Sequence, residues 1–394
     1  ADGTAWNYDV TVYPKNATGM PTLEKGVREA VASNGKTHAY TEIATASDGD
    51  TLEYQIISKL PSITSASTYL SEYSFADQLA SGISYKKNDV VIEIFKDEAL
   101  EDKVATWDEA SGKFTVSYDG NKMNIAMAES GLAEINEATT VYTTGTNSGY
   151  SDCFMAIRYG AKLNSDATVV YGSTGNANTV TLTWKRTNAD YSDSLSDNAI
   201  VYTYGIDLTK KFSDGKGDLS KVKFIIENNT DICYVTAQLK DGIYYVTGFN
   251  ADKAKATVFT PNSNGHIIVK GLEDDNYILI ETATDDGYTA LKAGIPVSIV
   301  ATDGVASAKV NGKDVAADAT LPSEKFNISL RNFTDNTFPE VENDSSFSVI
   351  FDTDKIVMDN SVELYFDKET LKPIACKYVC AMALDQSLTM SGDF

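Results

Sequence analysis

The sequence predicts an all-β protein built from tandem β-sandwiches. Most of the chain consists of short runs of alternating apolar and polar residues, separated by turns rich in glycine, asparagine and aspartate. Helical periodicity is scarce, and only 97–103 and 131–138 suggest short helices. Many short strands at close spacing are typical of sandwiches of the immunoglobulin-like type.

The first expected strand, residues 6–16, ends beside a lysine. Val10 and Val12 fall on one face with Pro14, whereas Tyr13 and Lys15 fall on the other. Proline cannot donate a hydrogen bond to a sheet, so the strand stops or runs along an edge at Pro14. Lys15 is therefore expected at a fixed, exposed place beside a rigid edge.

Further along, residues 51–57 and 113–118 alternate as strands do, and Asp119-Gly120 is a hairpin-turn signal. Three polar residues of this first half take positions on apolar strand faces: Lys25, Asp77 and Asn178. Lysine comes first in the chain, the acid in the middle and asparagine last.

The second half repeats that order. Residues 277–281 alternate as a strand, and Asp241-Gly242 is another hairpin-turn signal. A lysine, an acid and an asparagine again lie on apolar strand faces: Lys210, Glu281 and Asn332.

Such a set of residues permits a specific reaction. Burial lowers the pKa of a lysine, so its amine can be a neutral nucleophile, and burial raises the pKa of an acid, which can then stay protonated. The acid polarises the asparagine carboxamide and moves protons while the amine attacks. Ammonia leaves, and a Lys–Asn isopeptide bond ties the first strand of the domain to the last. The competing interpretation is an ordinary polar residue whose head group reaches water.

Domain boundaries follow from composition. A polar stretch at 186–198 separates two strand-rich regions. We therefore expect a first domain at 1–188 and a second at 199–339. Residues 340–394 contain strand-like runs and stay unassigned to either domain.

Composition also limits the function. The formal net charge of −23 in 394 residues argues against nucleic acid and against an anionic membrane surface as partners. No run reaches the roughly 18 apolar residues of a membrane span, and no signal peptide is visible. The four cysteines show neither zinc nor redox spacing. We expect no cofactor and no metal.

Taken as a whole, the opening strand resembles the pilin motif of Gram-positive sortase-assembled backbone pilins. The residues that carry the resemblance are Trp6, Val10, Val12, Tyr13, Pro14, Lys15 and Asn16. In that family a class C sortase joins this lysine to the C-terminal threonine of the next subunit. The resemblance implies that Lys15 is the acceptor of an intersubunit isopeptide bond.

The first domain resembles the CnaA-type domain of such pilins. The runs at 21–25, 49–56, 75–79 and 175–182 carry that resemblance. By position, Lys25 and Asn178 match the bonded pair and Asp77 matches the acid. Asn176 is a rival to Asn178, because strand parity does not separate them.

The second domain resembles the CnaB type. Residues 271–288 are similar to the pilin E-box, whose glutamate matches Glu281, although the usual Ala-Pro after Glu-Thr is altered. Lys210 and Asn332 match the bonded pair, and the rival Lys211 has the wrong parity. The chain departs from the family in having no Leu-Pro-x-Thr-Gly and no N-terminal domain before the pilin motif.

We therefore predict a backbone pilin, the structural shaft subunit of a pilus anchored to the cell wall outside the cell. Its partners would be other copies of itself, a class C sortase, and tip and basal pilins. The alternative is a cell-wall adhesin or tip pilin that binds host glycan or matrix protein. A turnover enzyme is not expected, since the chain has only two histidines and no Gly-x-Ser-x-Gly, His-Glu-x-x-His or phosphate loop.

Overall fold

The computed structural model describes most of the chain from residue 19 onward, and beyond residue 315 it describes the backbone only. The described residues are 19–30, 37–63, 68–136, 149–164, 166–167, 175–315, 317–318, 325–334, 341–343, 347–349, 364–366, 373–384 and 386–393. Trp6 to Asn16, including Lys15, lie outside them.

Two facing sheets form the first half of the molecule. Within the described residues, the first sheet has the order β1-β3-β10-β6-β7, with β5 also paired to β10, and the second has the order β2-β12-β11-β4-β9-β8. The first contains β1 (Glu24–Glu29), β3 (Thr51–Lys59), β5 (Ile83–Tyr85), β6 (Val91–Phe95), β7 (Lys103–Asp108) and β10 (Phe154–Leu163). The second contains β2 (Ile43–Thr45), β4 (Leu70–Leu79), β8 (Phe114–Asp119), β9 (Lys122–Met127), β11 (Asn176–Arg186) and β12 (Asp193–Tyr202).

The alternation in these strands places one face of each sheet in a common core. Tyr54 of β3 and Tyr159 of β10 project from the first sheet, and Phe75 of β4 and Leu182 of β11 project from the second. All four are almost completely buried. The core of the first sandwich therefore lies between the sheets that carry Lys25 and Asp77.

The second half is a sandwich whose strands form one continuous ladder. The order is β19-β24-β13-β17-β16-β15-β14-β18-β20-β21-β22 within the described residues, with β23 paired to β24. The strands are β13 (Tyr204–Phe212), β14 (Lys223–Asn228), β15 (Cys233–Lys240), β16 (Ile243–Asn250), β17 (His266–Leu272), β18 (Asn276–Ala283), β19 (Tyr288–Thr289), β20 (Ile295–Thr302), β21 (Val305–Val310), β22 (Lys313–Val315), β23 (Ala317–Asp318) and β24 (Lys325–Thr334). Tyr204, Phe224 and Tyr277 are among its largest buried side chains.

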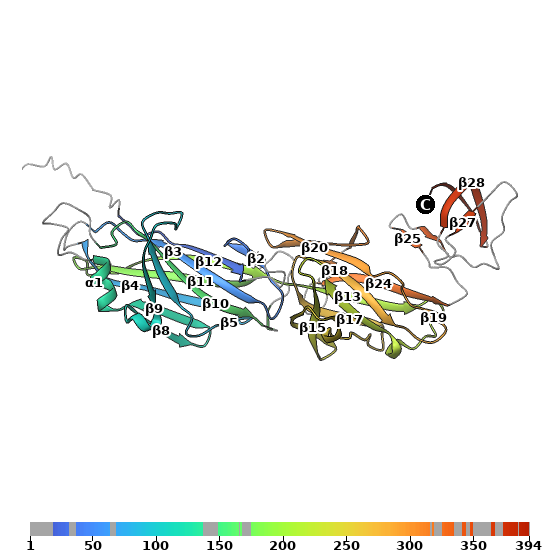
Figure 1. Ribbon diagram of the computed structural model, residues 1–394, viewed down its shortest axis with the longest axis horizontal. Coiled ribbons are helices and arrows are strands. Elements are labelled where there is room, and N and C mark those ends of the chain that lie inside the picture. Colours follow the sequence, from blue (N-terminus) through green and yellow to red (C-terminus); the bar gives the residue numbers. More distant parts are fainter. Residues whose placement is uncertain are drawn as a thin grey trace, which may run out of the picture.

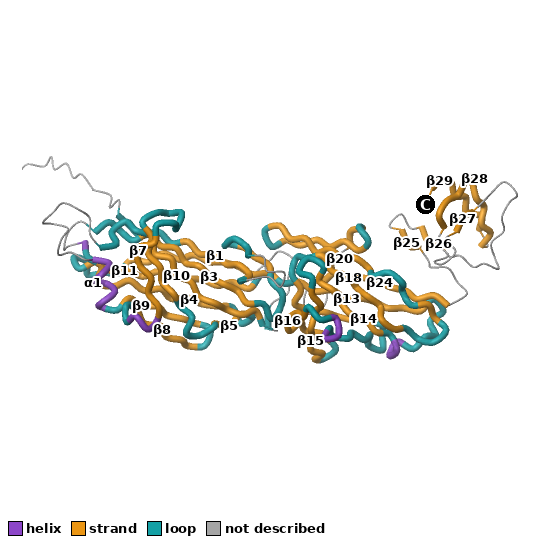
Figure 2. The backbone as a smooth tube through the Cα atoms, in the orientation of Figure 1, coloured by secondary structure: helices purple, strands orange, loops and turns teal. Residues whose placement is uncertain are grey.

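The two sandwiches follow one another along the long axis of the molecule (Figure 1). Short strands lie beyond the second one, namely β25 (Val341–Asn343), β26 (Phe347–Val349), β27 (Leu364–Phe366), β28 (Pro373–Leu384) and β29 (Gln386–Asp393). Figure 2 shows how little of the described chain is helical. The all-β prediction is confirmed.

The local predictions were mostly right. Helix α1 (Glu129–Asn136) occupies the second expected helical segment, and Asp241 and Gly242 both take positive φ between β15 and β16. The helix expected at 97–103 is absent from the described structure. There the Asp97 carboxylate accepts hydrogen bonds from the backbone N–H groups of Glu101 and Asp102, at 3.0 and 2.7 Å, which closes a turn instead.

The break expected at 186–198 differs from the structure. Strand β12 runs through Asp193–Tyr202 and pairs along most of β11, so this segment belongs to the first sandwich. Its first six residues are exposed or half-buried, because one edge of the sheet faces solvent there. Ala199 and Val201 are buried in the first core, and Tyr202 is the first residue of the second. The polar sequence of this strand was therefore interpreted as a linker between domains.

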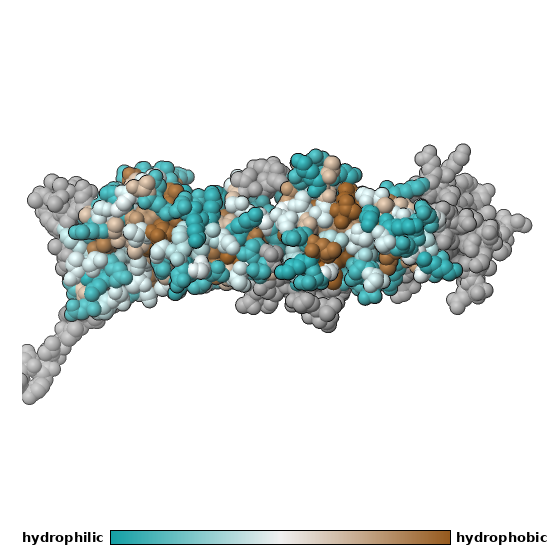
Figure 3. Space-filling model, turned by 90° about the horizontal axis from the view of Figure 1, so that it is seen from below, coloured by the Kyte–Doolittle hydropathy of each residue, from teal (hydrophilic) through white to brown (hydrophobic). Residues whose placement is uncertain are grey.

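The visible face of the molecule is largely hydrophilic, with separate apolar patches on both sandwiches (Figure 3). Among the described residues, no helix has the length and apolar character needed to cross a membrane.

Candidate functional site

Lys25 is a buried lysine in the core of the first sandwich. It is the second residue of β1, opposite Ile56 of β3, on the face that also buries Val27. Its backbone N–H donates to Asp197 Oδ2 at 2.7 Å. Only 3% of the residue is exposed, so the amine cannot be solvated by bulk water and needs partners within the core.

Those partners come from both sheets. Lys25 Nζ contacts the Asp77 carboxylate of β4 in the facing sheet. The same nitrogen donates a hydrogen bond to the Tyr159 hydroxyl at 2.8 Å, and the Tyr54 ring centroid lies 5.2 Å from it. The lysine and the acid that were predicted from their order in the chain are therefore in direct contact.

Asp77 is completely buried and accepts hydrogen bonds on both carboxylate oxygens. Tyr159 donates to Oδ2 and Tyr85 to Oδ1, each at 2.8 Å. Strand β4 presents Asp77 inward because the residue keeps the parity of Phe75 and Leu79.

Asn178 is the third member of the cluster. It lies on β11 with no exposed surface, and its Nδ2 donates to the Tyr159 hydroxyl at 2.9 Å. Its Oδ1 is buried and has no hydrogen-bond partner among the described residues. Because β11 is followed by β12 in the same sheet, Asn178 lies on the penultimate strand of this sandwich, not the last.

The rival Asn176 is also buried, but its surroundings differ. Its Nδ2 donates to the backbone carbonyl of Val201 at 3.2 Å. A Cβ on Gly82 would lie 2.7 Å from Asn176 Oδ1, so that amide packs against the β4–β5 turn. The Asn176 amide thus bonds to the backbone of β12, whereas Asn178 bonds to the hydroxyl that contacts Lys25.

The electrostatics of this site favour a neutral amine. Burial lowers the pKa of Lys25, and the charge of Asp77 opposes that shift without cancelling it. A neutral amine beside a carboxamide and a carboxyl group is the arrangement that amide exchange requires.

The second sandwich contains a similar pair. Lys210 of β13 and Glu281 of β18 approach across the core, with Nζ 3.1 Å from Oε1 and both side chains fully buried. Glu281 Oε2 accepts from the backbone N–H of Leu291 at 2.8 Å. Burial lowers the pKa of Lys210 to about 8, against the opposing effect of Glu281. The Phe224 ring centroid is 5.9 Å from Nζ.

Asn332 lies on β24, the strand that runs parallel to β13. In that register Lys210 is opposite Leu330, and Asn332 is opposite Phe212, two residues further along. The side chain of Asn332 lies outside the described part of the structure. The rival Lys211 is exposed and has the opposite parity to Lys210.

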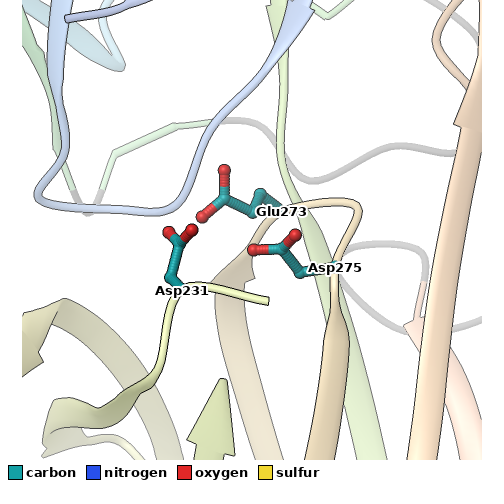
Figure 4. Close-up of side chains that lie close together, drawn as sticks. All are labelled: Asp231, Glu273 and Asp275. Carbon is teal, nitrogen blue, oxygen red and sulfur yellow. The ribbon is translucent and has the colours of Figure 1, made fainter. Parts of the chain in front are cut away.

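The junction between the sandwiches holds an acidic cluster that the sequence did not predict. Asp231, Glu273 and Asp275 extend their carboxylates toward a shared space (Figure 4), and their ligand atoms lie within 4.8 Å of one another. Oxygen ligands of this kind suit a hard divalent cation. The run 273–275 was visible in the sequence, but Asp231 is far from it in the chain.

A loop of the first sandwich, residues 45–50, supplies the other side of this junction. Asp48 N–H donates to the Gly271 carbonyl at 2.9 Å, and Ser47 Oγ donates to Glu273 Oε1 at 3.2 Å. A neighbouring cavity of about 420 Å³ is lined by residues of both sandwiches, among them Glu29 and Asp231.

The junction carboxyl groups hold protons unusually tightly. Burial raises the pKa of Glu29 and of Asp48 to about 8, and that of Asp50 to about 7, with Asp50 or Asp231 adding a further rise in each case. Burial raises the pKa of Glu273 well above its usual range, and Asp50 adds to that shift. The carboxylates of this junction therefore repel one another in a poorly solvated space.

One family model matches the chain. Residues 205–314, most of the second sandwich, match the SpaA prealbumin-like fold domain. No curated protein matches the chain.

Several solved structures share the fold at low sequence identity. The pilus 2b backbone protein of group B streptococcus is 20% identical, with a TM-score of 0.50, 74% of this chain covered and 95% of that one. A C-terminal fragment of the major pilin GBS80 of Streptococcus agalactiae is 17% identical, with a TM-score of 0.54 and coverage of 79% and 99%. The pilus backbone RrgB of Streptococcus pneumoniae is 12% identical, with a TM-score of 0.50 and coverage of 80% and 100%.

These comparisons define the class by its fold. The chain has the fold of Gram-positive backbone pilins, with a prealbumin-like SpaA domain as its second sandwich. The resemblance drawn from the sequence is confirmed at this level.

Proposed function

We propose that this chain is the structural shaft subunit of a covalently polymerised surface pilus, outside the cell and anchored to its wall. The observation that carries the proposal is that each sandwich buries a lysine against a carboxylate, Lys25 with Asp77 and Lys210 with Glu281. The fold shared with backbone pilins supports the same conclusion.

The two buried pairs are proposed to form internal isopeptide crosslinks. Lys25 would join Asn178, and Lys210 would join Asn332, with Asp77 and Glu281 as the acids. Replacing a buried ion pair by well-packed apolar residues is often neutral or stabilising, so ion pairing alone is a weak reason to bury two lysines. An amide product, by contrast, removes the buried charge of the lysine, because its nitrogen becomes a neutral amide and Asp77 keeps a proton.

Lys15 is proposed as the acceptor for polymerisation. A class C sortase would join it to another copy of the chain, and tip and basal pilins would complete the fibre. Lys25 and Lys210 are buried in the sandwich cores, whereas the sequence places Lys15 beside an edge. The chemistry of the chain is then a single-turnover reaction on itself, not turnover of a substrate.

The polymer is tested by expressing the chain with a class C sortase and examining covalent ladders on denaturing gels. Lys15→Ala is expected to abolish the ladder while leaving the monomer folded, and Lys211→Ala, which removes an exposed lysine of the second sandwich, is the matched control. Ladders that persist in Lys15→Ala would show that another lysine is the acceptor.

A further inference from the structure

One hydroxyl group contacts all three members of the first candidate site. The Tyr159 oxygen lies 2.8 Å from Lys25 Nζ, 2.8 Å from Asp77 Oδ2 and 2.9 Å from Asn178 Nδ2. Tyr159 is 2% exposed and comes from β10, in the sheet that carries the lysine. No pattern in the sequence singled it out.

These three contacts use the whole hydrogen-bonding capacity of a phenol. A tyrosine hydroxyl has one proton and two acceptor lone pairs. Here the proton is directed to Asp77, and the lone pairs accept from Lys25 and Asn178. The Tyr159 ring stacks on Tyr54, with centroids 5.5 Å apart at 16°, which fixes its plane.

Crosslinking requires a proton to reach the departing nitrogen. Lys25 first gives a proton to the Asp77 carboxylate and becomes a neutral amine. Its nitrogen then bonds to Cγ of Asn178, and Nδ2 must gain one proton before the Cγ–Nδ2 bond breaks and ammonia leaves. Asp77 recovers a proton from the attacking nitrogen, which ends as an amide N–H, so atoms and charges balance.

Asp77 does not reach that nitrogen by itself. Among the described residues, no hydrogen bond joins the Asp77 carboxylate to the Asn178 carboxamide, and Tyr159 is hydrogen-bonded to both. We propose that Tyr159 is a catalytic residue in the formation of the first crosslink, where it passes a proton from Asp77 to Nδ2 of Asn178. This inference rests on the proposed crosslink. The phenol gives up its own proton as it takes one from the acid.

The surroundings of the phenol suit a concerted relay. Burial raises the pKa of Tyr159 well above its usual range, and the charge of Asp77 adds to that shift. A free phenolate is therefore not formed, and the hydroxyl acts only while it receives a proton as it donates one. Tyr85 contacts the other oxygen of Asp77 and neither reacting nitrogen, so it cannot substitute for Tyr159.

The test is Tyr159→Phe, with crosslinking at the first site followed by intact mass and peptide mapping during cell-free synthesis. We expect the bond to form at least about 100-fold more slowly, the lower range for loss of a general acid. The second sandwich is an internal control, because its bond should form at the normal rate. Tyr73→Phe is the matched control, since it removes another buried hydroxyl, bonded to Ser58 at 2.6 Å, from the same core.

The outcomes separate this inference from the function on which it rests. A wild-type chain without the first crosslink would refute the proposed function. A wild-type chain with the bond, and a Tyr159→Phe chain that forms it equally fast, would overturn the role of Tyr159 alone. A slow but complete reaction in a folded variant supports the relay.

If Tyr159→Phe does not fold, 3,5-difluorotyrosine at position 159 keeps the hydroxyl and the ring. Its more acidic phenol should change the rate of bond formation at a fixed pH, because the relay passes on the proton of the phenol, whereas a purely structural role would leave that rate unchanged. An unchanged rate would overturn the proposal.

Discussion

Both buried lysines depend on a carboxylate supplied by a strand far away in the chain. Lys25 meets Asp77, and Lys210 meets Glu281, with each side chain fully buried. In both cases the lysine pKa is lowered by burial more than the acid raises it. Each pair is thus prepared to exchange a proton, and each stands beside the strand that carries the proposed asparagine.

Replacing Asp77 by asparagine should prevent the first crosslink while keeping the shape of the side chain. The purified wild type is expected to weigh two ammonia molecules less than its sequence mass, and Asp77→Asn only one less than its own. Asp197→Asn is the matched control, since Asp197 accepts from the Lys25 backbone and not from its amine. Two missing ammonia molecules in Asp77→Asn would refute the role of this acid.

The second site distinguishes two neighbouring lysines. Lys210→Met should lose the second crosslink, at a cost of about 4–5 kcal/mol in unfolding free energy by the loop-closure model. Lys211→Met, at the exposed neighbouring position, should keep the mass deficit and change stability by less than about 0.5 kcal/mol. Mass spectrometry and chemical denaturation measure both. The reverse pattern would make Lys211 the bonded residue.

At the scale of elements, the junction loop 45–50 fixes one sandwich against the other. It is anchored to the second sandwich by the backbone bond from Asp48 to Gly271 and the side-chain bond from Ser47 to Glu273, and it faces several carboxyl groups. Gly49 has φ +97°, and a Cβ there would lie 2.4 Å from the Thr247 carbonyl oxygen. The close approach of these two backbones requires glycine.

Gly49→Ala is therefore expected to separate the loop from the second sandwich and to increase the maximum dimension or flexibility seen in small-angle scattering. Gly112→Ala is the control, because Gly112 also has positive φ but open space around its Cβ position. Gly112→Ala should lower the free energy of unfolding by about 1–2 kcal/mol, the strain of an alanine in the left-handed conformation, and should leave the scattering unchanged. Scattering that is also unchanged in Gly49→Ala would show that the loop does not set the junction.

The junction should loosen as pH rises from about 4 to about 8. The carboxyl groups of Glu29, Asp48 and Asp50 have folded-state pKa values of about 8, 8 and 7, above their ordinary values. The closed junction therefore binds more protons than the open one in this range, and its stability falls as those protons are lost. Hydrogen-exchange protection of residues 45–50, corrected for intrinsic rates, should decrease with pH.

Asp48→Asn should reduce this pH dependence, because a neutral amide replaces a group with a raised pKa. Asp89→Asn serves as the control and should leave the dependence unchanged, because the Asp89 carboxylate bonds to Lys86 and to the Gly160 backbone and not to the junction loop. Protection that rises with pH in the wild type would contradict the assignment of these carboxyl groups.

For the whole molecule, the crosslinks would act on the unfolded state and on the unfolding rate. Closing a loop on the order of 100 residues lowers the entropy of the unfolded chain. In the loop-closure model this raises the free energy of unfolding by about 4–5 kcal/mol. Reductants do not cleave an isopeptide bond, so this constraint would persist under reducing conditions. A shaft under tension would depend mainly on slow unfolding.

A chain with both Lys25→Met and Lys210→Met should therefore melt at a lower temperature and unfold faster than the wild type. It should also be cleaved by trypsin at temperatures at which the wild type resists. The single variants are expected to lose this resistance in one sandwich each. A double variant that unfolds as slowly as the wild type would show that the crosslinks do not control unfolding.

Much of the fold and part of the site could be predicted from the sequence. Strand parity alone placed Lys25, Asp77, Lys210 and Glu281 on inward faces, because side chains alternate across a strand. The sequence pattern failed at β12. The first six residues of this strand are exposed or half-buried, and their polar composition is the same as that of a linker between domains. The pattern also could not choose between Asn176 and Asn178, which share one face.

The tertiary structure decided what lies beside what. Periodicity records which face of a strand is buried, but not which residue of the facing sheet fills the same space. Tyr159, the junction loop 45–50 and the cluster of Asp231 with Glu273 and Asp275 became visible only when strands distant in the chain came together. Those contacts depend on the order and register of the strands, which are set by packing across the core and not by the local pattern of any one segment.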